Sequence, residues 1–200
     1  QARYGLVLRN QGRNDESRKV LDAAIPTLDG LRARGDASEA TAIGLALGLI
    51  AQSRLVLDTR SSDALASAQR AVDLLQQPAQ ASGSSPALRR AYAAALTQKG
   101  FVQQRRNRND DALVTLAAAL EAYRAVDGLR NDSDAQVNFA ITSSWLMDAL
   151  NTAGRAADAL RIGDEVRIEW PLAFPRVARI EGARSGPLQR GTLFVLLPSW

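Results

Sequence analysis

Apolar and polar positions alternate along this chain with a helical period, in stretches separated by short polar breaks. After each of four breaks, small or apolar residues recur at intervals of four and seven, which places them on one face of a helix. The pattern predicts that residues 1–169 are entirely α-helical. The expected helices are 1–11, 14–32, 37–58, 63–77, 86–106, 110–127, 134–152 and 155–169.

The breaks recur at a nearly constant interval. The small residue five positions into each break is Ser17, Ala64, Ala112 or Ala159, so that successive copies are 47, 48 and 47 residues apart. Each copy reads as two helices joined by a tight turn. Such hairpins cannot bury their apolar faces alone, so the repeat predicts a stack of hairpins.

Capping residues indicate where several helices begin. Asp36 with Glu39, and Ser133 with Gln136, have the spacing of a capping box, and Ser85 precedes a proline at a first helical position. We therefore expect helix starts at these three places. A stretch rich in Pro, Gly and Ser, 77–85, is expected to be the longest loop, and Pro26 is expected to kink the second helix.

Local motifs within the repeat resemble those of the tetratricopeptide repeat family. Gly5 and Gly100 fall where that family has a glycine in its first helix, and segments 61–65, 111–113 and 158–160 resemble the opening of its second helix. The resemblance covers residues 1–169 and implies an α-solenoid of about four antiparallel hairpins. Because the period of 47–48 exceeds the usual 34 or so, a HEAT-like or armadillo-like solenoid is the alternative.

Charge and composition restrict the functions that this fold could have. The chain has 25 basic and 21 acidic residues, and residues 170–200 alone hold four arginines and one glutamate. The remaining chain is therefore nearly neutral, with interspersed signs, which disfavours nucleic-acid binding. The longest apolar run, 40–51, is shorter than the roughly 20 residues that a membrane span needs. We expect no membrane insertion.

The sequence contains no recognisable catalytic or metal-binding motif. There is no cysteine and no histidine, and no phosphate-binding glycine loop is present. The acidic pairs Asp110/Asp111 and Asp132/Asp134 could bind a hard metal ion, but both stand at expected helix starts, where carboxylates serve as caps. We therefore expect no enzyme activity, no metal and no cofactor. An enzyme that acts through paired carboxylates is the remote alternative.

The resemblance also implies where a partner would bind. In tetratricopeptide repeats the first helix of each hairpin lines the binding surface, which suits an extended peptide. The basic cluster Arg105, Arg106 and Arg108 could in addition attract an acidic partner, or it could complement a helix terminus. The residues expected to bind a partner are Leu6, Arg9, Asn10, Leu49, Ser53, Val56, Thr97, Phe101, Gln104, Arg105, Ser144, Asp148 and Asn151.

Residues 170–200 differ in composition from the repeats. Four prolines interrupt this segment, and it ends with the apolar run 193–197 followed by Trp200. We expect a C-terminal cap over the last hairpin. The alternatives are a linker that leads to another domain, or a segment that lies in a groove, in which case 193–200 would support self-association.

These features favour an interaction module that binds a protein or peptide. The resemblance implies a helical region within a larger bacterial signalling or regulatory protein, preceded by another domain, and we expect it to be cytoplasmic. The alternative is a sensor whose solenoid changes curvature when a peptide or small ligand binds.

Overall fold

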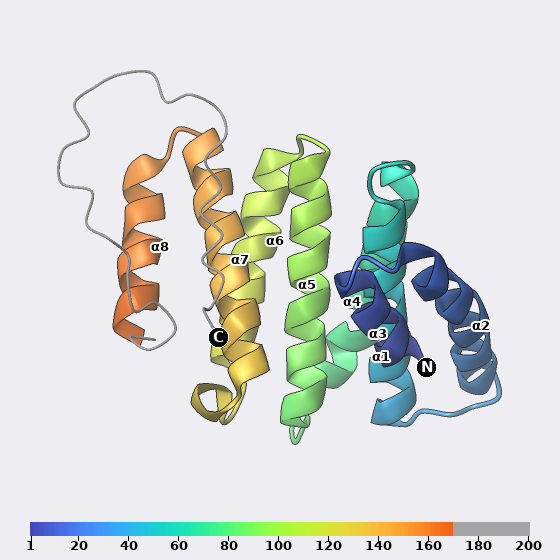
Figure 1. Cartoon of the computed structure of the whole chain (residues 1–200). Helices are drawn as coiled ribbons and strands as arrows, with labels where there is room; N and C mark the ends of the chain where they lie inside the picture. Colours follow the sequence, from blue (N-terminus) through green and yellow to red (C-terminus); the bar gives the residue numbers. More distant parts are fainter. Residues whose placement is uncertain (170–200) are drawn as a thin grey trace.

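The computed structural model describes residues 1–169 of the 200, and this part of the chain is all-helical (Figure 1). The eight α-helices expected from the sequence are confirmed. The expected cap 170–200, with the segment 193–200 considered for self-association, lies outside the described residues. The helices are α1 (Ala2–Asn10), α2 (Asn14–Ala33), α3 (Glu39–Val56), α4 (Ser61–Gln80), α5 (Pro86–Arg105), α6 (Asn109–Arg124), the 3₁₀ turn η1 (Leu129–Asn131), α7 (Ser133–Thr152) and α8 (Ala156–Glu169).

Consecutive helices pack against each other along the whole described chain. We call α1, α3, α5 and α7 the A helices, and α2, α4, α6 and α8 the B helices. Each A helix before α7 contacts the A helix that follows it, α2, α4 and α6 contact the A helices before and after them, and α8 contacts α7. Figure 1 shows the resulting row, with α5 to α8 standing side by side. One side of every A helix is therefore not covered by a B helix.

The small residues that define the repeat occupy equivalent places in the four A–B pairs. Ser17, Ala64, Ala112 and Ala159 are all buried, with at most 4% of their surface exposed. They lie in the first turn or two of each B helix, where it approaches its A helix. Ser17 donates a hydrogen bond from Oγ to the carbonyl oxygen of Gly5 at 2.7 Å. A larger side chain at these places would force the two helices apart.

One turn further along each B helix, a large residue on one helix faces a small residue on the other. A Cβ atom on Gly100 would lie 2.6 Å from Cγ of Leu116, and one on Gly5 would meet a leucine at 2.7 Å. In the last hairpin the sizes are exchanged, since a Cβ atom on Gly163 would lie 3.3 Å from Sδ of Met147. The equivalent pairs by position are Gly5–Leu21, Gln52–Ala68, Gly100–Leu116 and Met147–Gly163.

The turn inside each hairpin has a recurring geometry. Gly12, Asn107 and Gly154 take a left-handed backbone conformation, with φ between 59° and 76°. The amide of the following arginine then donates to a carbonyl five residues earlier, as between Arg108 and Gln103 at 2.9 Å. The second hairpin has Thr59 at this place, without the left-handed conformation, because a β-branched residue disfavours it.

An exposed ion pair marks the start of every B helix. The arginine that precedes the helix pairs with an acidic residue three positions later, and the repeat spacing of 47 or 48 carries both residues through all four copies. The Arg13–Glu16 hydrogen bond raises the pKa of the arginine and lowers that of the glutamate. The pairs are Arg13–Glu16 at 2.5 Å, Arg60–Asp63 at 3.5 Å, Arg108–Asp111 at 2.7 Å and Arg155–Asp158 at 2.8 Å.

Two of the three expected helix starts use a different capping residue. Ser38, not Asp36, caps α3, and its Oγ accepts from the amide of Thr41 at 3.3 Å. Asp132, not Ser133, caps α7 through the amide of Ala135 at 3.0 Å. In both cases a side-chain oxygen three residues before a free amide was available within two residues of the expected cap. The expected cap at Ser85 is confirmed, with Leu88 donating at 3.1 Å.

Proline does not end α4. The helix continues through Pro78 to Gln80, beyond its expected end at 77. Ala79 is only 7% exposed and joins the same apolar core as Leu75, so burial favours the additional turn. The loop is consequently shorter than the stretch 77–85. Pro26 likewise lies inside α2.

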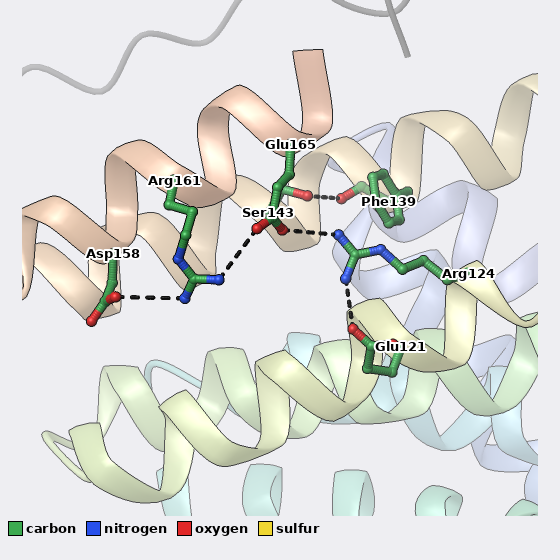
Figure 2. A network of polar contacts seen from close by, with 7 residues as sticks. All are labelled: Glu121, Arg124, Phe139, Ser143, Asp158, Arg161 and Glu165. Atoms are coloured by element: carbon green, nitrogen blue, oxygen red, sulfur yellow. Dashed lines mark hydrogen bonds and ion pairs between the residues drawn. The ribbon is translucent and has the colours of Figure 1, made fainter. Parts of the chain in front are cut away.

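A network of ion pairs connects the B helices α6 and α8 (Figure 2). Arg124 lies between Glu121, at 2.6 Å, and Glu165, at 3.4 Å. Glu165 also binds Arg161 at 3.2 Å, and Arg161 lies 3.5 Å from Asp158. Only 27% of the Arg124 side chain is exposed, so this arginine is screened less by solvent than the surface pairs are.

Helix α3 carries the longest apolar run. Among the described helices it alone is long and apolar enough to cross a membrane by length and composition, and 56% of it is buried inside the protein. Leu45, Leu49 and Ile50 are each at most 2% exposed and belong to one apolar cluster with residues of α2, α4 and α5. The run thus forms the centre of the helical core.

Candidate functional site

The candidate site is the exposed side of the A helices, and four of the residues expected there are in fact buried. Leu49, Ser53, Val56 and Thr97 are at most 6% exposed. They do not line an accessible surface, because α3 and α5 each touch two neighbouring A helices and two B helices. Only a narrow stripe of each helix remains open. On α3, the side expected to face a partner therefore faces the core instead.

The other nine expected residues are exposed or half-buried. Phe101, Gln104 and Arg105 lie near the end of α5, and the three expected residues of α7 are exposed. Two exposed apolar side chains, Val137 at 56% and Ile141 at 39%, lie on α7 as well. The nine residues are Leu6, Arg9, Asn10, Phe101, Gln104, Arg105, Ser144, Asp148 and Asn151.

Between α5 and α7, the structure joins expected residues to partners that the sequence did not reveal. The ring of Phe101 stacks on that of Trp145, with centroids 4.3 Å apart and an angle of 20° between the planes. Gln104 donates a hydrogen bond to the carboxylate of Asp148. The half-buried aromatic pair thus presents an apolar place beside a polar one, an arrangement that suits an extended peptide.

Between α1, α3 and α5, the central residue is Arg54. Its Nε donates to Oε1 of Gln98 at 2.9 Å, and its Nη1 donates to Oδ1 of Asn10 at 3.3 Å. Gln98 is fully buried and is itself held by a hydrogen bond from Nε2 to Oγ of Ser53 at 3.1 Å. Burial is the main cause that lowers the pKa of Arg54, and the positive charge of Arg9 lowers it further.

The sequence analysis did not identify Arg54, Gln98 or Trp145. A signal for Arg54 was nevertheless present, because it is the only charged residue between Glu39 and Asp58, within the most apolar helix. A lone arginine in such a context needs a polar environment. No comparable signal distinguished Trp145 from an ordinary core aromatic residue.

The three arginines of the basic cluster, Arg105, Arg106 and Arg108, each contact a different residue of the protein. Arg105 lies 3.6 Å from Asp58, and Arg106 lies 3.5 Å from the carbonyl oxygen of Ser61. Arg108 forms the B-helix ion pair with Asp111 at 2.7 Å. These contacts link α5 to the preceding hairpin and neutralise part of the cluster's charge.

The acidic pairs also serve local contacts. Asp111 belongs to the ion pair just described, while Asp132 caps α7 and pairs with Arg90 of α5. Within residues 1–169, no group of three or more acidic side chains is close enough to hold a metal ion.

A hollow of about 470 Å³ with mainly aliphatic walls lies between α1, α2 and α3, beside Leu28, Ile43 and Leu47.

Comparison of the chain with models of protein families, with curated proteins and with solved structures found no match. The functional argument therefore depends on the geometry of the A-helix surface.

Proposed function

We propose that this chain is a tetratricopeptide-like α-solenoid that binds a protein or peptide on the exposed side of its A helices. The repeat of 47 or 48 residues and the buried small residue at the same place in each hairpin support a solenoid. The order of contacts among α1, α3, α5 and α7 also supports it. No comparison assigns a partner, so the chemistry of the surface must indicate one.

The observation that carries the proposal is the continuous series of side chains across three junctions between A helices. Asn10, Arg54 and Gln98 connect α1, α3 and α5, and the Phe101–Trp145 stack connects α5 and α7. Amide and guanidinium groups can bind peptide backbone and side chains, and a half-exposed aromatic pair can receive an apolar side chain. Among the described residues, the B helices are instead connected by ion pairs, from α2 to α4 and from α6 to α8.

In a larger protein this region would act as the binding part. The resemblance supports a place within a bacterial signalling or regulatory protein in the cytoplasm, beside a domain that carries out the chemistry. The solenoid would then bring a partner close to that domain. Its effect would depend on the partner and would need no catalytic residue of its own.

Two substitutions, each of an exposed aliphatic residue by glutamate, test the proposed surface. Ile141→Glu changes an exposed apolar residue on the A helix α7, and Val114→Glu changes one on the B helix α6. Both positions are exposed, so neither change opens a cavity. Proteins captured from a bacterial lysate by the wild type would be purified, and their Kd measured for all three forms by titration calorimetry.

We expect Ile141→Glu to weaken binding about tenfold or more, and Val114→Glu to leave the Kd unchanged. If Ile141→Glu binds with the same Kd as the wild type and Val114→Glu binds more weakly, the binding surface lies on the B helices. Failure of every form to retain a protein would contradict a binding role.

A further inference from the structure

Two arginines of the neighbouring A helices α1 and α3 have no acidic partner among the described residues. Arg54 of α3 binds only the neutral side chains of Gln98 and Asn10. Arg9 of α1 is close enough to lower the pKa of Arg54, and its own Nε is enclosed without a hydrogen-bond partner. Neither guanidinium forms an ion pair with any residue in the described part of the chain.

The nearest acidic residue along α3 does not relieve this charge. Asp58 follows Arg54 by four residues, about one helical turn. Its carboxylate instead lies 3.6 Å from Arg105 of α5, and 81% of its side chain is exposed. Arg54 turns toward α1 and α5, where Gln98 holds its Nε. The arrangement keeps a carboxylate away from the two arginines.

This pair differs from three other arginines that connect helices in this protein. Arg70, Arg90 and Arg124 each pair with a carboxylate on a neighbouring helix. Burying two like charges without a counter-charge costs free energy, because the charges repel and lose hydration. Arginine keeps its proton in such places, so the cost is relieved only by an anion.

We propose that Arg9 and Arg54 form a receptor for a carboxylate side chain of an acidic peptide. This inference rests on the proposed binding function of the A-helix surface. A guanidinium group binds a carboxylate through two parallel N–H donors. Gln98, fixed by Ser53, holds Arg54 in place, and Arg9 adds a second guanidinium, whose enclosed Nε has no hydrogen-bond partner among the described residues.

The rest of the surface favours a peptide over a polyanion. The α7 part of the A-helix side carries the exposed acidic residues Asp134 and Asp148. A nucleic acid would meet these charges along its backbone, whereas a peptide with one acidic position would not. Gln104 and Ser144 offer amide and hydroxyl groups for the peptide backbone. The expected ligand is therefore an extended peptide with an acidic residue beside an apolar one.

The anion site can be tested without knowing the natural partner. Thermal unfolding would be recorded in sodium chloride, sodium glutarate and sodium phosphate at equal ionic strength. The proteins would be the wild type, Arg54→Met, Arg9→Met and the control Arg106→Met, which removes an arginine that forms no ion pair among the described residues. We expect glutarate to raise the Tm of the wild type and of Arg106→Met, and to leave both other variants unchanged.

Two results would overturn the carboxylate assignment. The first is an equal Tm increase in Arg54→Met and in the wild type, which would show that the anion acts elsewhere. The second is a larger increase with phosphate than with glutarate that Arg54→Met abolishes, which would show a site for tetrahedral anions.

A peptide selection separates this inference from the proposed function. Random peptides displayed with a blocked C-terminus would be selected on the wild type, and the strongest binder remade with each acidic residue changed to its amide. We expect one such change, or Arg54→Met, to weaken Kd about tenfold or more, and the combination to add little further. Binders without acidic residues that Arg54→Met retains would overturn the receptor but leave the binding function standing. Selection of no peptide would instead contradict the peptide-binding function, and the glutarate experiment would still judge the anion site.

Discussion

The close approach of Gly100 to Leu116 predicts that the smallest possible enlargement of this glycine destabilises the fold. A Cβ atom would lie 2.6 Å from Cγ and 2.7 Å from Cδ2 of Leu116, and 3.4 Å from the Leu116 backbone nitrogen. Such distances are well inside van der Waals contact, so α5 and α6 would have to separate or Leu116 would have to leave its place. Overpacking of this kind costs about 1–3 kcal/mol.

Gly44 provides the matched control for this change. It also lies inside an A helix, but a Cβ atom there would meet only the Leu28 methyl groups, at 3.6 Å and 3.7 Å, which is ordinary contact. Alanine is the better helix former by roughly 0.5–1 kcal/mol, and this gain is common to both substitutions. We therefore expect Gly44→Ala to stabilise the protein and the two variants to differ by about 1–3 kcal/mol.

Urea unfolding followed by circular dichroism would give both free energies of unfolding. Each kcal/mol corresponds to about 2–4 °C in Tm for a chain of this size. Leu116→Ala alone should cost about 2–5 kcal/mol, because it leaves a cavity. Combining it with Gly100→Ala should cost about 1–3 kcal/mol less than the sum of the single changes, because the shorter side chain removes the clash. Equal stabilisation by Gly100→Ala and Gly44→Ala, or additivity in the double variant, would refute the packing argument.

Three further predictions concern single contacts. Hydrogen bonds from the Thr41 and Ser38 side chains and the Ser38 amide lower the pKa of Asp36 from 3.8 to about 2, so its stabilisation is present above pH 4 and is lost as the pH falls through about 2. The difference in free energy of unfolding between the wild type and Asp36→Asn should therefore shrink over this pH range in acid titrations; a constant difference would contradict a role of these hydrogen bonds. For the Phe101–Trp145 stack, a double-mutant cycle to alanine should give a coupling of about 0.5–1.5 kcal/mol, whereas strict additivity would show that the rings do not interact. Glu165→Gln should lower the free energy of unfolding by about 0.5–1 kcal/mol at low salt and by less in 1 M NaCl, because it removes the ion pair with Arg124. An equal decrease at both salt concentrations would show that the effect is not ionic.

Much of the helical framework could be predicted, because it depends on local signals that repeat. The interval of 47 or 48 residues placed all eight helices, and Ser17 and its equivalents proved to be buried. Helix ends were less predictable. Ser38 caps α3 two residues after the expected cap Asp36, and burial of Ala79 extends α4 past Pro78. In both cases the helix end lies within about one turn of the expected position, and packing against neighbouring helices determines where it falls.

The candidate surface could be predicted only in part. On α7 the exposed and buried positions alternate clearly, and Ser144 and Asp148 lie on the surface as expected. On α3 nearly every residue is apolar, so no polar stripe indicated which side faces solvent, and Leu49 and Ser53 were placed outside although they are buried. The role of Arg54 depends on Asn10 and Gln98, which are distant in sequence. Such contacts between neighbouring hairpins require the three-dimensional packing.

Site-specific photocrosslinking tests the central claim, binding on the exposed side of the A helices, most directly. A photoreactive phenylalanine derivative would replace Ile141 on α7 or Val114 on α6 in the full chain, expressed in a bacterial cell. Covalent adducts would then be identified by mass spectrometry. The account predicts adducts to a partner protein from position 141 and none from position 114. Adducts from 114 alone, or the same adducts from both positions, would contradict it.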